Sequence, residues 1–272
     1  MFKTPRGQAR LRRLGLFAAA AGTAALVAYV LFSHGYVRFV YPARAEFPVR
    51  GVDVSHHQGR MDWARIRAAG YEFAWIKATE GETFRDSAYL RNRDEARRAG
   101  LVTGPYHYFT LCTAGQAQAL NLLAVQPGDG GPSLPPAVDL EFGGNCSERP
   151  PRDSVRAEVR RFLAVIDSAY RRPAVLYVTP EFHAEYMAGE AEHPLWVRSV
   201  YHRPRYGGGW TFWQYAATGR LPGVRGLIDL DAFHGTRTQF AAFIRPAAPA
   251  APASARSSAP STHATKDSAA RR

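Results

Sequence analysis

The chain has 272 residues, 46% of them apolar and 12% aromatic, so it has ample material for a core and is not a disordered protein. Its formal net charge of +12 is concentrated at the two ends. Residues 1–50 hold eight Lys and Arg against one acid, residues 246–272 hold four against one, and residues 51–245 carry only +2. Binding to nucleic acid needs clustered basic residues on the folded domain, so we expect no nucleic-acid partner.

The N-terminus predicts a membrane segment. Residues 1–13 contain five Lys and Arg, and residues 14–32 contain no charged residue, a length close to the roughly 20 residues that cross a bilayer as a helix. No convincing small-residue cleavage site follows. We therefore expect a basic cytoplasmic segment at 1–13, an uncleaved transmembrane signal anchor at 14–32 and a spacer at 33–48. A cleaved signal peptide is the alternative, and both place residues 51 onward outside the cytoplasm.

Residues 49–245 form one predicted domain. Its short apolar runs predict eight strands, at residues 51–55, 73–79, 104–110, 137–141, 174–179, 195–200, 211–216 and 227–233. Helical patterns follow the first five strands, at residues 62–69, 87–99, 114–125, 153–170 and 180–187, whereas the last three strands leave no room for helices between them. A helix at 236–244 closes the domain. The Pro-, Ala- and Ser-rich residues 246–272 are expected to be a disordered tail.

The alternation of strands and helices predicts an α/β fold with a parallel sheet that is covered on both faces. Eight strands in one domain favour a TIM-like (β/α)5(β)3 barrel from which the last helices are missing. An open doubly wound sheet is the second possibility. No Gly-x-Gly-x-x-Gly or phosphate-loop signature follows a predicted strand, so we expect no nucleotide and no other cofactor.

Acidic residues occur at the carboxyl ends of the predicted strands, where such a barrel has its active site. Asp139 and Glu141 are two residues apart on one strand, so their side chains point the same way. Two neighbouring carboxyl groups do not ionise together easily, which leaves one as a proton donor and the other as an anion. Glycoside cleavage uses both. The short pattern also fits a strand-end ion pair or a helix cap, but Asp53 and Asp229 at neighbouring strand ends favour the catalytic interpretation.

The histidines and cysteines raise two further possibilities. A hydrolytic zinc site needs three ligands and an open position, but His56, His57 and His107 stand in no His-Glu-x-x-His or comparable pattern, so we expect no metal. His107 is expected to form hydrogen bonds within the barrel instead. Cys112 and Cys146 are the only cysteines. They form one disulfide in an oxidising compartment or are two unrelated thiols.

Short motifs occur in a definite order over residues 51–235. They are Gly51-Val52-Asp53-Val54-Ser55 with Gln58, Ile76-Lys77-Ala78-Thr79-Glu80-Gly81, Gly104-Pro105-Tyr106-His107, Pro136-Ala137-Val138-Asp139-Leu140-Glu141, Leu195-Trp196, Phe212-Trp213-Gln214-Tyr215 and Ile228-Asp229-Leu230. Each motif is short, but the ordered set resembles glycoside hydrolase family 25. These are lysozymes that cleave the β-1,4 bond between N-acetylmuramic acid and N-acetylglucosamine in peptidoglycan.

The resemblance implies the same barrel of five βα units followed by three strands, and it implies roles for individual residues. Glu141 is implied as the general acid/base. Asp139 is implied to assist the substrate's 2-acetamido group, which acts as the internal nucleophile in the proposed retaining mechanism. Asp53 and Asp229 would complete an acidic floor. The residues implied to contact substrate are Tyr106, Tyr177, Trp196, Trp213 and Gln214.

Two positions depart from the family pattern. Asp231 stands where Asn is common, and His56 and His57 stand where Ser or Asn is common, but neither change removes a catalytic carboxylate. The resemblance therefore implies a muramidase that acts on peptidoglycan glycan strands. With the signal anchor, it would lie in the bacterial inner membrane as a single-pass protein with its catalytic domain in the periplasm. A non-catalytic wall-binding module and a component of an envelope machine, with protein partners unknown, are the alternatives.

Overall fold

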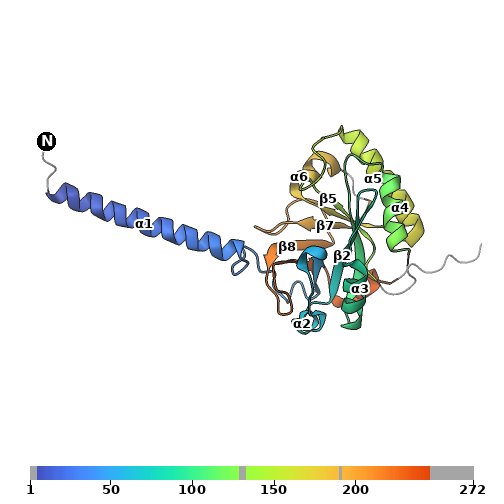
Figure 1. Cartoon of the computed structure of the whole chain (residues 1–272), viewed down its shortest axis with the longest axis horizontal. Coiled ribbons are helices and arrows are strands. Elements are labelled where there is room, and N and C mark those ends of the chain that lie inside the picture. The colour runs from blue at the N-terminus through green and yellow to red at the C-terminus, as the bar shows by residue number, and fades with distance from the viewer. Residues whose placement is uncertain (1–4, 129–132, 190–191, 246–272) are drawn as a thin grey trace, which may run out of the picture.

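The computed structural model describes residues 5–128, 133–189 and 192–245 (Figure 1). Within them, eight strands form a barrel: β1 (Arg50–Val54), β2 (Phe73–Glu80), β4 (Val102–Tyr108), β5 (Ala137–Leu140), β6 (Val175–Val178), β7 (Leu195–Arg198), β8 (Phe212–Gly219) and β9 (Ile228–Phe233). Their order around the sheet is β1-β9-β8-β7-β6-β5-β4-β2, and pairing of β1 with β2 closes it. The predicted eight-stranded barrel is confirmed. The predicted tail, residues 246–272, lies outside the described residues.

The last strand departs from the expected parallel sheet. β9 runs antiparallel to both β1 and β8, whereas the other neighbouring pairs of the barrel are parallel. A parallel connection needs a crossover of about a dozen residues or more, and the segment 220–227 between β8 and β9 is too short for one. The chain therefore turns back as a hairpin. A short extra strand, β3 (Phe84–Arg85), pairs with the end of β2.

Helices cover the outside of the barrel (Figure 1). They are α2 (Trp63–Ala68), α3 (Tyr89–Arg98), α4 (Gly115–Val125), α5 (Arg152–Tyr170), α6 (Pro180–Phe182) with the π-helical turn η2 (His183–Met187), and α7 (Arg237–Phe243). Their bounds agree with the predicted helices to within two residues. Local capping explains this agreement at three ends, since the side chains of Asp62, Thr179 and Thr236 accept hydrogen bonds from the backbone of the first turn.

Aromatic residues fill the amino-terminal end of the barrel. Phe73 lies at the start of β2, Phe212 at the start of β8 and Phe233 at the end of the antiparallel β9, so all three are at the same end. The next layer holds Trp75 and Trp196, whose stacked rings have centroids 4.4 Å apart. Because these layers close one end, the interior space is left at the carboxyl ends of the parallel strands.

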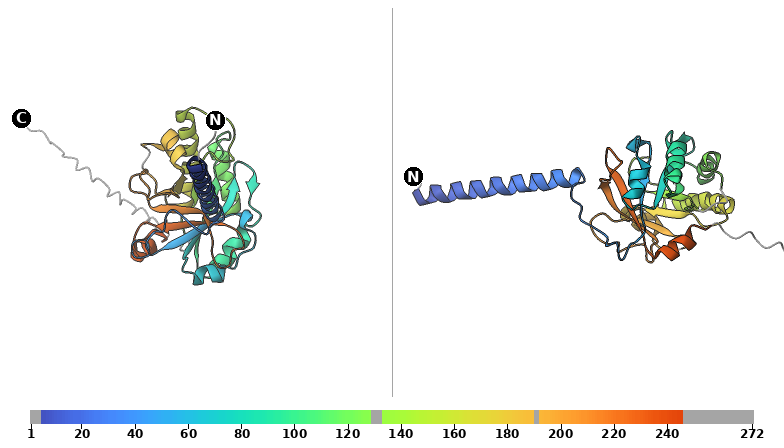
Figure 2. Two further views of the ribbon diagram at one scale, coloured as in Figure 1. Left: turned by 90° about the vertical axis from the view of Figure 1, so that its left-hand side faces the viewer. Right: turned by 90° about the horizontal axis from the view of Figure 1, so that it is seen from below.

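The N-terminal helix α1 (Pro5–Ser33) projects away from the barrel (Figures 1 and 2). Its stretch Arg12–Ser33 is long and apolar enough to cross a membrane and is not buried against the domain. The expected spacer, residues 33–48, packs on the barrel, beginning at the carboxyl end of the barrel. Phe47 is 1% exposed, and its ring centroid lies 5.6 Å from that of Trp213 and 6.2 Å from that of Trp210.

Candidate active site

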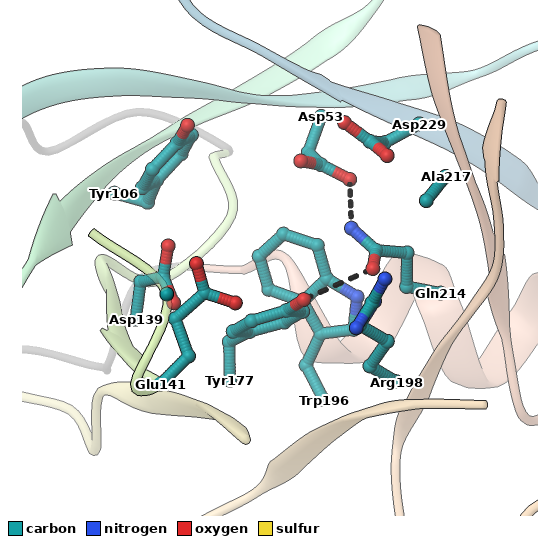
Figure 3. Close-up of a pocket in the computed structure, with 11 residues that line it drawn as sticks. Asp53, Tyr106, Asp139, Glu141, Tyr177, Trp196, Arg198, Gln214, Ala217 and Asp229 are labelled. Atoms are coloured by element: carbon teal, nitrogen blue, oxygen red, sulfur yellow. Dashed lines mark hydrogen bonds between the residues drawn. The ribbon is translucent and has the colours of Figure 1, made fainter. Parts of the chain in front are cut away.

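A pocket of about 390 Å³ opens at the carboxyl ends of the strands (Figure 3). Its lining combines acidic, aromatic and amide side chains with one arginine. The lining residues are Asp53, Tyr106, Asp139, Glu141, Gly143, Tyr177, Trp196, Arg198, Gln214, Ala217 and Asp229. The structure thus brings the four predicted carboxylates into one cavity.

Strand register explains why the four carboxylates meet. The β9 hairpin places Asp229 directly opposite Asp53 of β1. Asp139 lies near the end of β5 beside Tyr177 of β6, and Glu141 is two residues further along. Figure 3 shows Asp53 and Asp229 on one side of the pocket and Asp139 and Glu141 on another, with their carboxyl groups directed into the cavity. A substrate in the pocket would lie between two pairs of acids.

The carboxyl groups of Asp139 and Glu141 hold protons more strongly than isolated carboxyl groups do. Burial is the main cause of the raised pKa of both. The pKa of Asp139 lies well above its usual range because the negative charges of Glu141 and Asp53 add to the effect of burial. Arg198 and Lys77 offset part of the rise in the pKa of Glu141. The pair can therefore retain a proton that a solvent-exposed pair would lose.

A chain of hydrogen bonds crosses the floor of the pocket (Figure 3). The Tyr177 hydroxyl donates to Gln214 Oε1 at 3.0 Å, and Gln214 Nε2 donates to Asp53 Oδ2 at 2.9 Å. Burial raises the pKa of Asp53 to about 6, and the hydrogen bond from Gln214 limits that rise. Asp53 is thus held in one orientation and changes its charge close to neutral pH.

Asp231 lies behind Asp53 and is completely buried. Its Oδ1 accepts a hydrogen bond from Trp196 Nε1 at 2.8 Å. Burial and the charge of Asp53 raise the pKa of Asp231 well above its usual range, whereas a hydrogen bond from Asp231 lowers the pKa of Asp53. Asp231 therefore serves as a neutral acid that donates to Asp53, which an Asn could also do through its amide.

Four of the five residues expected to contact substrate line the pocket: Tyr106, Tyr177, Trp196 and Gln214. Trp213 does not, and that expectation is corrected. Successive residues of a strand face opposite sides, so Trp213 faces outward because Gln214 faces the interior. Its ring packs on Phe47, and its Nε1 donates to the carbonyl oxygen of Ser199 at 2.8 Å.

Arg198 is a pocket residue that the sequence analysis did not single out. It ends β7 two residues after Trp196, so both side chains face the interior. Burial raises the pKa of Glu141 and, to well above its usual range, that of Asp229, and the positive charge of Arg198 offsets part of both rises. Alternation along the predicted strand, started from Trp196, would have identified it.

The loops after β4 and β5 are fastened together beside Glu141. Cys112 and Cys146 form a disulfide between them, with Cα atoms 6.2 Å apart, so the predicted bond is present. Asn145 strengthens the junction: its Oδ1 accepts from the backbone N–H of Leu111 at 2.9 Å, and its Nδ2 donates to the Glu141 carbonyl at 3.1 Å. The backbone that carries Glu141 is therefore held on both sides.

The histidines considered as metal ligands have other partners. His56 Nδ1 pairs with Asp86 at 2.9 Å. His107 is buried between Thr79, at 2.7 Å from its Nδ1, and Gln118, at 3.1 Å from its Nε2. Burial lowers the pKa of His107 to about 4, so it is neutral. His107 forms hydrogen bonds as expected, but on the outer face of the barrel, to β2 and α4. The described residues contain no cluster of three His, Cys, Asp or Glu with metal-ligand geometry.

Comparison with known proteins agrees with this site. Residues 52–224, which include Asp53, Asp139 and Glu141, match the sequence profile of "Glycosyl hydrolases family 25". Lysozyme M1 of Streptomyces globisporus is 33% identical over 215 residues, which cover 74% of this chain and 72% of that protein. Two solved structures are similar in fold. A family 25 glycosyl hydrolase from Bacillus anthracis has a TM-score of 0.72 at 30% identity, over 77% of this chain and 99% of its own. The bacterial lysozyme from Streptomyces coelicolor has a TM-score of 0.67 at 32% identity, over 74% and 98%. The chain therefore belongs to glycosyl hydrolase family 25.

Proposed function

We propose that the chain is a membrane-tethered muramidase that hydrolyses the β-1,4 bond between N-acetylmuramic acid and N-acetylglucosamine in peptidoglycan. The family and the relatives named as lysozymes support this substrate. The observation that carries the assignment is the convergence of four buried carboxyl groups in one pocket, two of them an Asp-x-Glu pair with raised pKa values. A module that only bound the wall would not need a buried proton donor.

Glu141 is assigned as the general acid/base. It follows the end of β5, on the loop braced by Asn145, and its carboxyl group is directed into the pocket (Figure 3). Its raised pKa favours the protonated form that donates to the leaving glycosidic oxygen. The carboxylate that remains can then take a proton from water, and Arg198 lowers the free energy of that ionised state.

Asp139 is assigned to the substrate's 2-acetamido group. Its Oδ1 is buried and has no hydrogen-bonding partner among the described residues, so it is available to accept the amide N–H. This contact would direct the amide oxygen at the anomeric carbon. As that oxygen forms a bond to the carbon, the bond to the leaving oxygen breaks and the leaving oxygen receives the proton of Glu141. Water then opens the cyclic intermediate.

The remaining pocket residues are assigned to binding and charge stabilisation. Asp53 and Asp229 place carboxyl groups opposite the Asp-x-Glu pair, and in their ionised form these would stabilise the positive charge that develops on the sugar ring in the transition state. Tyr106, Tyr177 and Trp196 offer ring surface to the sugars. Trp196 is itself supported from below by its stack on Trp75.

The helix α1 is assigned as an uncleaved signal anchor in the bacterial inner membrane, with the barrel in the periplasm. The five basic residues that precede the apolar stretch support a cytoplasmic N-terminus. The alternative is a signal peptide that is cleaved to release the enzyme. N-terminal sequencing of protein purified from membranes, with protease accessibility of the barrel in spheroplasts, distinguishes the two. An N-terminus downstream of Ser33 contradicts the anchor.

The catalytic assignment is tested with the full chain in detergent. Glu141→Gln keeps the size of the side chain but removes the ionisable proton, so release of reducing ends from purified peptidoglycan should fall roughly 10²- to 10⁴-fold. Glu82→Gln, the same change at an exposed residue outside the pocket, is the matched control. Mass spectrometry of the products should find N-acetylmuramic acid at the new reducing ends. Tight binding without products would favour the wall-binding module, and equal activity of Glu141→Gln and wild type would refute the assignment.

A further inference from the structure

Exposed apolar side chains gather where α1 meets the barrel. After α1, the described residues include eight exposed large apolar side chains, and five of these belong to one region that we name the collar. The collar consists of Tyr36 (63% exposed), Val37 (46%), Phe39 (63%), Tyr41 (60%) and Tyr201 (63%). A cluster of exposed apolar side chains on a folded domain marks an interaction surface.

The collar is attached to the barrel. The ring centroid of Phe39 lies 4.8 Å from that of Phe32 in α1 and 5.3 Å from that of Tyr201, in the loop after β7. Gly35, with φ of +72°, lets the chain pass so close to β8 that an added Cβ would lie 2.0 Å from the carbonyl oxygen of Thr218. The end of α1 therefore joins the domain through a packed contact and not through a free linker.

The charges in the collar region suit an anionic lipid surface. The guanidinium of Arg38 lies 4.8 Å from the Tyr41 ring centroid, and that of Arg220 lies 4.3 Å from the Tyr36 ring centroid. Arg220 Nε also donates to the carbonyl oxygen of His34, the residue that follows α1. Tyrosines flanked by basic residues directly after an apolar helix are typical of the membrane–water interface.

We propose that the collar docks the barrel on the outer surface of the bilayer that α1 spans. The aromatic rings lie at the level of the lipid headgroups, and Arg38 and Arg220 contact lipid phosphates. The continuity of the collar with α1 identifies the bilayer as the occupant, because α1 ends at Ser33 and the first collar residue is Tyr36. A membrane-spanning α1 brings the collar to the bilayer surface, whereas nothing in the chain brings a soluble partner to it.

Docking also sets the position of the catalytic pocket relative to the membrane. Arg198 and Ala217 line both that pocket and a cavity of about 130 Å³ that touches Phe32 and Tyr201. The pocket and the collar are therefore neighbours on the barrel. The enzyme would therefore reach glycan at the membrane surface more readily than glycan further away. This choice of substrate rests on the proposed muramidase activity, whereas the docking does not.

Docking is tested on the full chain in vesicles of phosphatidylethanolamine and phosphatidylglycerol. Both native cysteines are in the disulfide, so an environment-sensitive fluorophore can be placed at a single new cysteine. Tyr201→Cys reports on the collar, and Leu120→Cys is the control, since Leu120 is 55% exposed on α4, which lies on the far side of the barrel from α1 (Figure 1). We expect emission at shorter wavelength and quenching by lipid-borne nitroxide at position 201 but not at position 120. Water-like emission without quenching at position 201 would overturn the docking. The readings are made in a Glu141→Gln background, so they do not depend on hydrolysis.

The substrate preference is tested with the double variant Phe39→Ser/Tyr201→Ser in the same vesicles. Wild type should cleave glycan oligomers attached to the vesicle faster than the same oligomers in solution. The double variant should lose this preference and keep its rate on free oligomers, which also shows that it folds. Leu120→Ser, on the far side, should behave as wild type. If docked wild-type enzyme cleaves both substrates at equal rates, the preference for membrane-proximal glycan is wrong although the docking stands.

Discussion

Asp53→Asn should make the protein more stable and inactive at the same time. Asp53 has a pKa of about 6 in the folded protein, against 3.8 for an aspartate in water, because burial disfavours its ionised form. The difference corresponds to about 3 kcal/mol at 1.36 kcal/mol for each pH unit. Asn removes this cost. Its side-chain oxygen can still accept from Gln214 Nε2, and its amide can donate to the carboxyl group of Asp231.

The stability difference between Asp53→Asn and wild type depends on pH. Well below pH 4 Asp53 is protonated in both the folded and the unfolded chain, so its ionisation contributes nothing to stability. As the pH rises from about 4 to 6, the unfolded chain ionises first and the wild type loses stability; above pH 6 the full cost is present. The advantage of Asp53→Asn should therefore be no more than about 0.5 kcal/mol at pH 4 and reach about 3 kcal/mol at pH 7. For a domain of this size, that is an increase in Tm of roughly 6–12 °C.

The assay is urea unfolding of the full chain in detergent, followed by tryptophan fluorescence at pH 4 and pH 7. Asp62→Asn is the control, since Asp62 is an exposed helix cap and Asn caps equally well, so its stability should match wild type at both pH values. Release of reducing ends measures the loss of activity. A stability difference between Asp53→Asn and wild type that does not change with pH, or a less stable variant at pH 7, would refute the argument that burial of this carboxylate is costly.

Three further outcomes follow from the structure. Asp231→Asn should keep kcat/KM within a few-fold of wild type at pH 5, because Asn retains the contact to Trp196. It should also move the alkaline decline of the pH–rate profile to higher pH, because it removes a titrating group. An unchanged profile would contradict this. Replacing both Cys112 and Cys146 by Ser should lower the free energy of unfolding by about 4 kcal/mol for a separation of 34 residues. Urea unfolding that shows no loss of stability would contradict this. Phe47→Ala should cost about 3–5 kcal/mol in thermal unfolding, whereas Tyr41→Ala, at a 60% exposed site, should stay within about 0.5 kcal/mol; equal effects would mean that residues 33–48 are not packed as described.

The candidate site shows how far strand patterns reach. Asp139 and Glu141 could be identified because their spacing of two on an apolar strand is a local signal. Asp53 and Asp229 could be placed nearby because each also stands at a predicted strand end. Both faces of β8 are buried, so the sequence around Trp213 and Gln214 does not show which of the two side chains points into the barrel. That ambiguity led to the wrong placement of Trp213, whereas alternation from Trp196 would have placed Arg198 in the pocket.

The amino-acid sequence by itself determined the strands and helices, the apolar segment of α1 and the identity of the acids at the strand ends. These features depend on periodicity, caps and charge within a few residues of each other. The tertiary structure alone decided the antiparallel direction of β9, the contact between Asp231 and Asp53, and the packing of residues 33–48 on the barrel. Each of these joins segments far apart in the chain, and their pairing follows from closure of the barrel and the space left by neighbouring side chains, which no local pattern records.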